Sequence, residues 1–93
     1  MDRVVVRLII RGRVQGVGYR WWAEGEAGRL GLDGWVRNRI DGTVELLAAG
    51  PAAAVERLIE ASRRGPPSAA VDAIDRFDAH DDGLRGFQSR PTA

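Results

Sequence analysis

A glycine-rich segment between a predicted strand and a predicted helix most constrains how this chain can fold. Residues 12–20 read Gly-Arg-Val-Gln-Gly-Val-Gly-Tyr-Arg. Glycines allow successive main-chain N–H groups to turn into one concave nest, which is suited to an anion. A helix beginning directly behind the nest adds the positive end of its dipole. Arg20 adds a forked donor that is always charged. The segment therefore predicts a phosphate-binding loop at a strand-to-helix connection.

The residues on either side of this segment have the periodicity that such a connection requires. Residues 3–11 alternate, and the apolar side chains of one face are Val4, Val6, Leu8 and Ile10. This period of two predicts a half-buried strand. After the loop, apolar residues recur at helical spacing at Tyr19, Trp22, Ala23, Ala27 and Leu30. Gly31 is expected to end this helix.

Residues 35–40 and 43–49 are predicted to be two strands joined by a turn at Asp41-Gly42. A two-residue turn would place Val36 on the same face as Glu45. A three-residue loop over 40–42, with Gly42 in the left-handed region, instead groups apolar side chains on one face. That face would carry Val36, Asn38, Val44 and Leu46. We favour the three-residue loop.

The second half of the chain repeats the order strand, helix, strand. Pro51 is expected in the first turn of a helix whose apolar stripe is Val55, Leu58 and Ile59, and Gly65-Pro66-Pro67 should stop it. Residues 70–79 are predicted to be a strand, with one face carrying Val71, Ala73 and Phe77. Residues 86–90 can form a short last strand, and the tail 91–93 is expected to be frayed.

The element order is therefore β-α-β-β-α-β with a short extra strand at the end. This order predicts an α+β protein, a ferredoxin-like sandwich with an antiparallel sheet and two helices on one face. The chain has 93 residues, which suits a single domain over residues 1–93.

Composition excludes several kinds of chemistry. The chain has no cysteine, so it cannot form a disulfide, a thiolate metal site or a cysteine nucleophile. All of its basic residues are arginine, which excludes lysine Schiff bases and P-loop lysines. The net charge is +1, so no global field attracts nucleic acid or membranes. No signal-peptide or membrane-spanning pattern is seen, and we expect a cytoplasmic protein.

The glycine segment does not match two common phosphate-binding motifs. A Walker P-loop requires Gly-Lys-Ser/Thr, which is lacking, and a dinucleotide fingerprint would need glycine where Trp21 stands. A glycine-rich connection without function is the remaining alternative. The polar Gln15 and the flanking arginines argue against it.

Two segments together carry a resemblance to a known family. Residues 12–20 and residues 34–45, Gly-Trp-Val-Arg-Asn-Arg-Ile-Asp-Gly-Thr-Val-Glu, resemble the two signature segments of acylphosphatases. The resemblance continues through Gly50-Pro51, Gly65-Pro66, the strand with Val71 and the ending Phe87…Arg90. Ser89 departs from it, since this place is usually hydrophobic, which leaves the packing of the last strand open.

The resemblance implies an enzyme that hydrolyses small acyl phosphates without a metal, cofactor or covalent phosphoenzyme. It implies that Arg20 binds the phosphoryl group and that Asn38 positions the attacking water. An inorganic phosphate or similar anion would occupy the loop, held by main-chain N–H groups of Gln15, Gly16, Val17, Gly18, Tyr19 and Arg20. We expect a monomer that binds neither nucleic acid nor membranes.

Two other functions are weighed against this one. The strand Gly34-Trp35-Val36-Arg37 is similar to an RNA-recognition strand, but residues 4–10 supply no aromatic partner. The chain could also be an idle relative, or resemble a module that passes carbamoyl phosphate within a larger maturation enzyme.

The remaining candidate residues carry weaker signals. His80 is expected to be a solvated loop residue. Residues 78–83 are faintly similar to a calcium loop, but Ser89 stands where the closing glutamate should be. Trp21 could either line the acyl side of the site or merely cover apolar surface.

Overall fold

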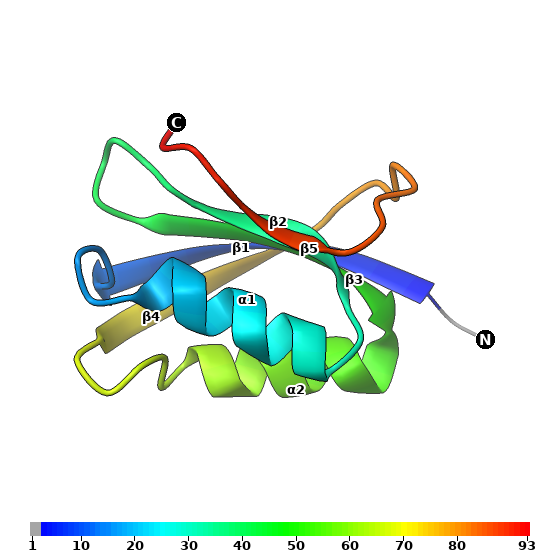
Figure 1. The fold of residues 1–93 in the computed structure, drawn as a ribbon, viewed down its shortest axis with the longest axis horizontal. Coiled ribbons are helices and arrows are strands. Elements are labelled where there is room, and N and C mark those ends of the chain that lie inside the picture. The colour runs from blue at the N-terminus through cyan, green and yellow to red at the C-terminus, as the bar shows by residue number, and fades with distance from the viewer. Residues whose placement is uncertain (1–2) are drawn as a thin grey trace.

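A five-stranded sheet carries both helices on one face (Figure 1). The computed structural model describes residues 3–93. In chain order the elements are β1 (Arg3–Arg13), α1 (Tyr19–Arg29), β2 (Asp33–Asn38), β3 (Val44–Pro51), α2 (Ala52–Ser62), β4 (Ala70–Asp78) and β5 (Phe87–Arg90). The strand order is β4-β1-β3-β2-β5. The predicted ferredoxin-like α+β fold is confirmed, with one refinement. The sheet is mixed, because β5 pairs parallel to β2 while the other pairs are antiparallel.

The main core lies between the sheet and the two helices. The alternating face of β1 and the apolar stripe of α2 both contribute to it, as the sequence predicts. Helix α1 buries Tyr19 and two alanines, whose small side chains allow the helix to approach the sheet closely. The buried members are Val6, Leu8, Ile10, Val14, Tyr19, Ala23, Ala27, Leu32, Val36, Val44, Leu46, Ala48, Val55, Leu58 and Ile59.

Helix α1 ends as predicted at Gly31, which has a φ of +70°. The N–H of Leu32 donates to the Ala27 carbonyl at 2.9 Å, and the N–H of Gly31 donates to the Gly28 carbonyl at 3.1 Å. This pair of bonds is the Schellman arrangement, which satisfies the last carbonyls of a helix. The expectation for Pro51 was wrong by one residue. Pro51 is the extended N-cap, with ψ of 140°, and α2 begins behind it.

The predicted face of β4 was wrong at Val71. The register of β1 with β4 shifts between Arg11 and Gly12, so that Asp72 has no partner in β1. This bulge returns Val71 to the helix side, where it packs on the core with Ile74. Phe77 keeps the opposite face and is 46% exposed. Gly12 is required here, because a Cβ on it would lie 2.2 Å from the Ala70 carbonyl oxygen.

The β2–β3 hairpin has the three-residue loop that was predicted from the grouping of apolar side chains on one face. Asn38 pairs with Val44 in the antiparallel register. The N–H of Arg39 donates to the Thr43 carbonyl at 2.9 Å, closing the loop over residues 40–42. Gly42 has a φ of +93°, the left-handed conformation that this loop needs. Asn38 therefore lies on the helix side of the sheet, at the end of β2.

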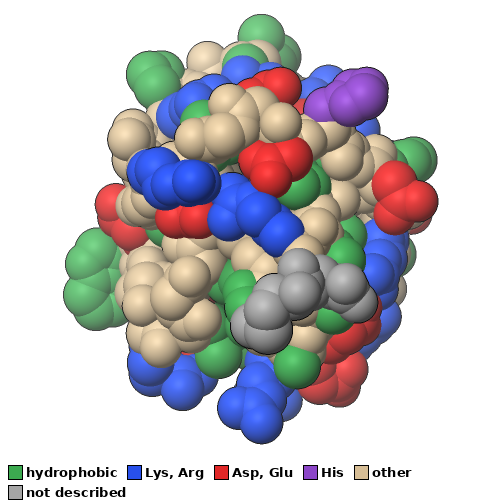
Figure 2. All heavy atoms as spheres, turned by 90° about the vertical axis from the view of Figure 1, so that its right-hand side faces the viewer, with side chains coloured by type: hydrophobic (Ala, Val, Ile, Leu, Met, Phe, Trp, Pro, Cys, Tyr) green, Lys and Arg blue, Asp and Glu red, His purple; other side chains and the backbone are tan. Residues whose placement is uncertain are grey.

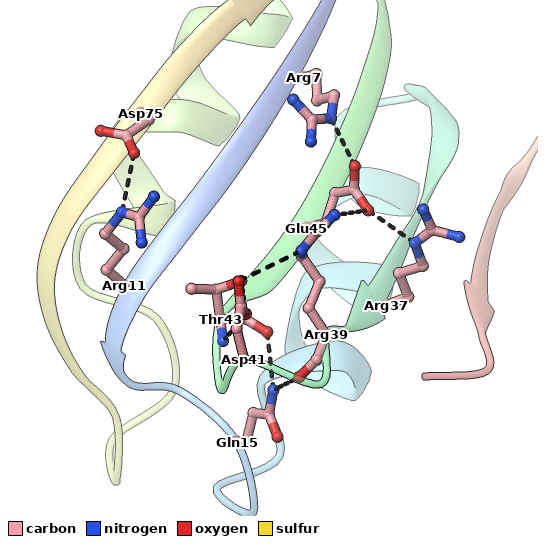
Figure 3. A network of polar contacts seen from close by, with 9 residues as sticks. All are labelled: Arg7, Arg11, Gln15, Arg37, Arg39, Asp41, Thr43, Glu45 and Asp75. Atoms are coloured by element: carbon pink, nitrogen blue, oxygen red, sulfur yellow. Dashed lines mark hydrogen bonds and ion pairs between the residues drawn. The ribbon is translucent and has the colours of Figure 1, made fainter. Parts of the chain in front are cut away.

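Two sets of hydrogen bonds join this hairpin to distant parts of the chain, one from Gln15 and one from the C-terminal tail. The Gln15 carboxamide nitrogen donates to the carbonyls of Arg39 and Thr43, at 2.8 Å each (Figure 3). The tail was expected to fray, but it is held. The N–H of Ala93 donates to the Asn38 carbonyl at 3.0 Å, and Ala93 accepts from the N–H of Ile40 at 2.8 Å. These bonds continue the β5–β2 pairing beyond Arg90, which is why the tail is fixed.

The end of the molecule that carries the start of β1 and the loop after β4 lies far from the hairpin (Figure 1). On this end, basic and acidic side chains are interspersed, and His80 is at the surface, in agreement with a solvated loop residue (Figure 2). Within residues 3–93, neither helix is long and apolar enough to cross a membrane.

The sheet face opposite the helices holds an ion network around Glu45 (Figure 3). Glu45 is only 3% exposed, and its carboxylate accepts from Arg7, from Arg37 at 2.7 Å and from Arg39 at 3.2 Å. Burial alone would raise the pKa of Glu45, but the hydrogen bonds from Arg7 and Arg37 outweigh it and hold the pKa below its ordinary value. Three strands are cross-linked in this way, next to the hairpin that carries Asn38.

We expect Glu45→Gln to lower the free energy of unfolding at neutral pH by about 1.5–3 kcal/mol, because it removes charge-assisted hydrogen bonds. The folded-state pKa of Glu45 is depressed. Its contribution is therefore full above the unfolded value of about 4.3 and is lost as pH falls through the lower folded-state value. The variant should lose less stability than the wild type as the solution is acidified below about pH 4.3. Urea unfolding at several pH values measures both effects.

The exposed Glu60 on α2, which pairs with Arg63 at 3.7 Å, supplies the matched control Glu60→Gln. This variant should follow the wild type closely, because exposed pairs contribute little. Equal stability losses on acidification in wild type and Glu45→Gln would contradict the role given to the network.

Candidate active site

A cavity of about 370 Å³ lies where α1 begins, between the glycine-rich loop and the end of β2. Four separate parts of the chain line it: the loop after β1, the first turns of α1, the end of β2, and β5. The lining residues are Val14, Gly16, Gly18, Tyr19, Arg20, Trp21, Glu24, Asn38 and Ser89. The fold therefore brings both predicted catalytic residues, Arg20 and Asn38, to one hollow.

The glycine-rich loop leaves its main-chain donors free. Gly16 and Gly18 have φ of +72° and +82°, and Gly18 is the left-handed N-cap of α1. Within residues 3–93, no acceptor is found for the N–H groups of residues 15–20, and the first helical N–H to donate is that of Trp22, to Gly18. Unpaired N–H groups at a helix N-terminus favour an anion, through both hydrogen bonding and the helix dipole.

Arg20 is the second residue of α1 and is half-buried at the cavity. Many arginines of this protein, such as Arg7, Arg11 and Arg37, are paired with carboxylates. In the described part of the chain, Arg20 has no carboxylate within ion-pair distance. Its charge is consequently available to a ligand.

Tyr19 anchors the start of the helix in the core. Its hydroxyl donates to the Ser62 carbonyl at 2.6 Å, and its ring packs edge-on against Trp22 with centroids 5.3 Å apart. Burial raises the pKa of Tyr19, which stays a neutral donor. The side chain is therefore occupied between the two helices, and the main-chain N–H is the group of Tyr19 that faces no internal partner.

Asn38 is fixed by its main chain and free at its side chain. Its backbone pairs with Val44, and its carbonyl accepts from Ala93 at 3.0 Å. Among residues 3–93, the carboxamide of Asn38 has no hydrogen-bond partner although it lines the cavity. A carboxamide carries both a donor and an acceptor, so it can hold a water molecule by either end.

Not every residue predicted for phosphate binding lines the cavity. Gly16, Gly18, Tyr19 and Arg20 do, whereas Gln15 and Val17 are not among the lining residues. The Gln15 carboxamide nitrogen donates to the hairpin carbonyls, and Val17 packs against the core. Gln15 therefore joins the loop to the strand that carries Asn38, and its main-chain N–H is the part left free.

Three lining residues, Val14, Glu24 and Ser89, were not predicted from the sequence as part of the site. Glu24 follows Arg20 by four residues, a spacing that puts two side chains on one helix face, so a signal existed. Ser89 reaches the cavity because β5 pairs parallel with β2, placing Ser89 beside Val36. No local pattern in the sequence indicates this pairing. For Trp21, the sequence left two roles open, lining the acyl side of the site or covering apolar surface. The residue lies at the cavity and is 81% exposed.

The segment 78–83, which is faintly similar to a calcium loop, makes hydrogen bonds within the protein. In the part of the chain that the structure describes, no three His, Cys, Asp or Glu side chains gather as a metal site. Asp81, in the faintly calcium-like segment, instead accepts from Arg3 at 2.6 Å and from the N–H of Gly83 at 3.0 Å.

The sequence and the fold are both similar to those of known proteins. The family model described as Acylphosphatase matches residues 6–89. An acylphosphatase of Rhizorhabdus wittichii is 50% identical over 91 residues, covering 98% of this chain and 92% of its own length. The crystal structure of acylphosphatase from Bacillus subtilis superposes with a TM-score of 0.90 at 40% identity, covering 94% of this chain and 98% of that one.

A larger protein also contains this fold. The crystal structure of full-length HypF in its phosphate- and nucleotide-bound form superposes with a TM-score of 0.90 at 25% identity, over 98% of this chain but 12% of that one. The family match and the close relatives extend over most of the sequence, including both segments that form the cavity. The chain therefore belongs to the acylphosphatase family.

Proposed function

We propose that this protein hydrolyses the carboxyl–phosphate bond of small acyl phosphates, giving a carboxylate and inorganic phosphate. Arg20 and the main-chain N–H groups of residues 15–20 bind the phosphoryl group, and Asn38 positions the attacking water. The observation that carries this proposal is the meeting of an unpaired arginine, a free carboxamide and a glycine-rich helix N-terminus at one cavity.

The chemistry needs little beyond positioning and charge stabilisation. The water oxygen forms a bond to phosphorus while the bond from phosphorus to the acyl oxygen breaks. The bonding electron pair leaves with the acyl oxygen as a carboxylate, which is stable at neutral pH and needs no general acid. The proton of the water goes to a non-bridging oxygen of the phosphate.

Arg20 is suited to the charge that develops in this transition state. Its planar guanidinium can hold two equatorial phosphoryl oxygens at once, and the loop N–H groups can hold the others. A site built in this way supplies its positive charge from the protein itself, and we propose that the reaction proceeds without a metal ion or cofactor.

The other expectations about the protein as a whole remain proposals. We propose one acylphosphatase domain over residues 1–93 that works as a monomer in the cytoplasm, with an inorganic phosphate or similar anion as the loop's ligand. The curated relative matches over 92% of its own length, which supports a free-standing enzyme over a module of a larger one. Sedimentation analysis should give the mass of one chain, and a dimer mass would contradict the monomer.

Arg20→Lys should lose at least about 2.7 kcal/mol of transition-state stabilisation, roughly 100-fold in kcat/KM, because an ammonium cannot form the bidentate fork. Phosphate release from an aryl acyl phosphate in EDTA measures this loss. Arg64→Lys, at an exposed position after α2, is the matched control and should keep wild-type rates. Wild-type rates in Arg20→Lys would refute the role of Arg20 in phosphoryl binding. A wild-type protein that is folded but does not hydrolyse the substrate would favour a catalytically inactive relative of the family.

Asn38→Ala should lower kcat more than it changes KM, because a positioned water contributes in the transition state and little to substrate binding. Steady-state kinetics on the same substrate separates the two constants. The exposed amide of Gln88, on β5 outside the cavity, gives the control Gln88→Ala. An effect of Asn38→Ala confined to KM would be incompatible with water positioning.

A further inference from the structure

An exposed tryptophan forms the outer wall of the cavity. Trp21 directly follows Arg20, and 81% of it is exposed to solvent. It lines the cavity that holds Arg20 and Asn38, and it also lines a second hollow of about 410 Å³ along α1. Trp21 and Glu24 line both hollows, so the two hollows lie next to each other. An indole that is this exposed does not cover the core, so packing does not explain why a tryptophan stands at position 21.

The second hollow can accept a flat apolar group. Its lining residues are Trp21, Trp22, Glu24, Gly25 and Glu26. Gly25 has no side chain, and a Cβ built on it would meet nothing within 4 Å. Glycine in the middle of a helix costs about 1 kcal/mol relative to alanine. The helix therefore keeps open space beside an aromatic surface at this position.

The side chains change from positive to negative between the cavity and the outer hollow. Arg20 lies at the phosphoryl end, and Glu24 lies one helical turn further along. The Ser89 hydroxyl makes a long, exposed hydrogen bond of 3.5 Å to the Glu24 carboxylate. Glu26 also lines the outer hollow, but its carboxylate is paired with Arg29 at 2.8 Å. A ligand with its phosphoryl group at Arg20 would extend its other end toward Glu24.

We propose that Trp21 and Glu24 select the acyl group of the substrate, so that the preferred acyl phosphates carry an aromatic or extended apolar acyl group without a second negative charge. This inference rests on the proposed function. Trp21 binds the acyl group by stacking, and Glu24 repels acyl groups that end in a carboxylate. Both are specificity residues and take no part in the phosphoryl chemistry.

The test compares kcat/KM for acetyl phosphate, benzoyl phosphate and 4-carboxybenzoyl phosphate in wild type and variants. Ratios between substrates are used because they cancel general losses of activity. In Trp21→Ala, the benzoyl-to-acetyl ratio should fall about 2- to 12-fold, the range that an aromatic pair contributes. Trp21→Phe should restore most of the ratio. An unchanged ratio in Trp21→Ala would overturn the assignment of the aromatic wall.

In Glu24→Gln, the ratio of 4-carboxybenzoyl to benzoyl phosphate should rise roughly two- to fivefold at low salt, the scale of an exposed charge interaction. The rise should shrink in high salt, because exposed charges are screened. Glu60→Gln, on α2 and outside both hollows, should leave the ratio unchanged. A ratio that does not rise in Glu24→Gln, or rises equally in Glu60→Gln, would overturn the charge selection.

A third variant tests the outer hollow by filling it, with Trp21 and Glu24 left in place. Gly25→Leu places a side chain in the open space and should lower the benzoyl-to-acetyl ratio, while the helix gains stability. No change in that ratio would contradict an acyl group in the outer hollow. If the wild type hydrolyses acetyl phosphate but the ratios do not move, the selection fails and the proposed function stands. If the folded wild type hydrolyses none of the three substrates, both fail.

Discussion

The hydrogen bonds of the Gln15 carboxamide join the two halves of the site. One half is the glycine-rich loop with Arg20, and the other is the end of β2 with Asn38. They are separated in the sequence by the whole of α1 and meet because β1 and β2 both flank β3. Gln15 then fixes their relative position by bonding the carbonyls of Arg39 and Thr43. In the mechanism that we propose, a phosphoryl group held by one half would face the carboxamide of the other.

The distribution of charge explains how a protein with a net charge of only +1 could hold the anion that we propose as its ligand. On the open face of the sheet, the buried carboxylate of Glu45 forms ion pairs with three arginines, Arg7, Arg37 and Arg39. At the cavity, Arg20 lacks such a partner among the described residues and faces unpaired N–H groups. The attraction for phosphate is therefore local. It arises from an unpaired arginine placed beside unpaired main-chain N–H groups, because the total charge is small.

Much of the fold and the inner site could be predicted from the sequence. The period of two in β1, the stripe of α2 and the three-residue hairpin loop all depend on short-range patterns, and all are confirmed. Apart from the one-residue error at Pro51, the failures involve long-range pairing. The bulge at Asp72 depends on contact between β4 and Gly12, and the ordered tail depends on Ala93 reaching Asn38. Ser89 was missed as a site residue for the same reason, since it reaches the cavity only through the parallel β5–β2 pair.

The most direct test of this account is a titration of the ¹⁵N-labelled protein with inorganic phosphate, followed by NMR. If the loop and Arg20 form the phosphate site, the amides of residues 15–20 and the Arg20 side chain should show the largest, saturable shifts. Arg20→Ala should weaken that binding strongly while the fold is kept. Shifts centred on the arginines around Glu45, with the loop amides unmoved, would contradict the central claim.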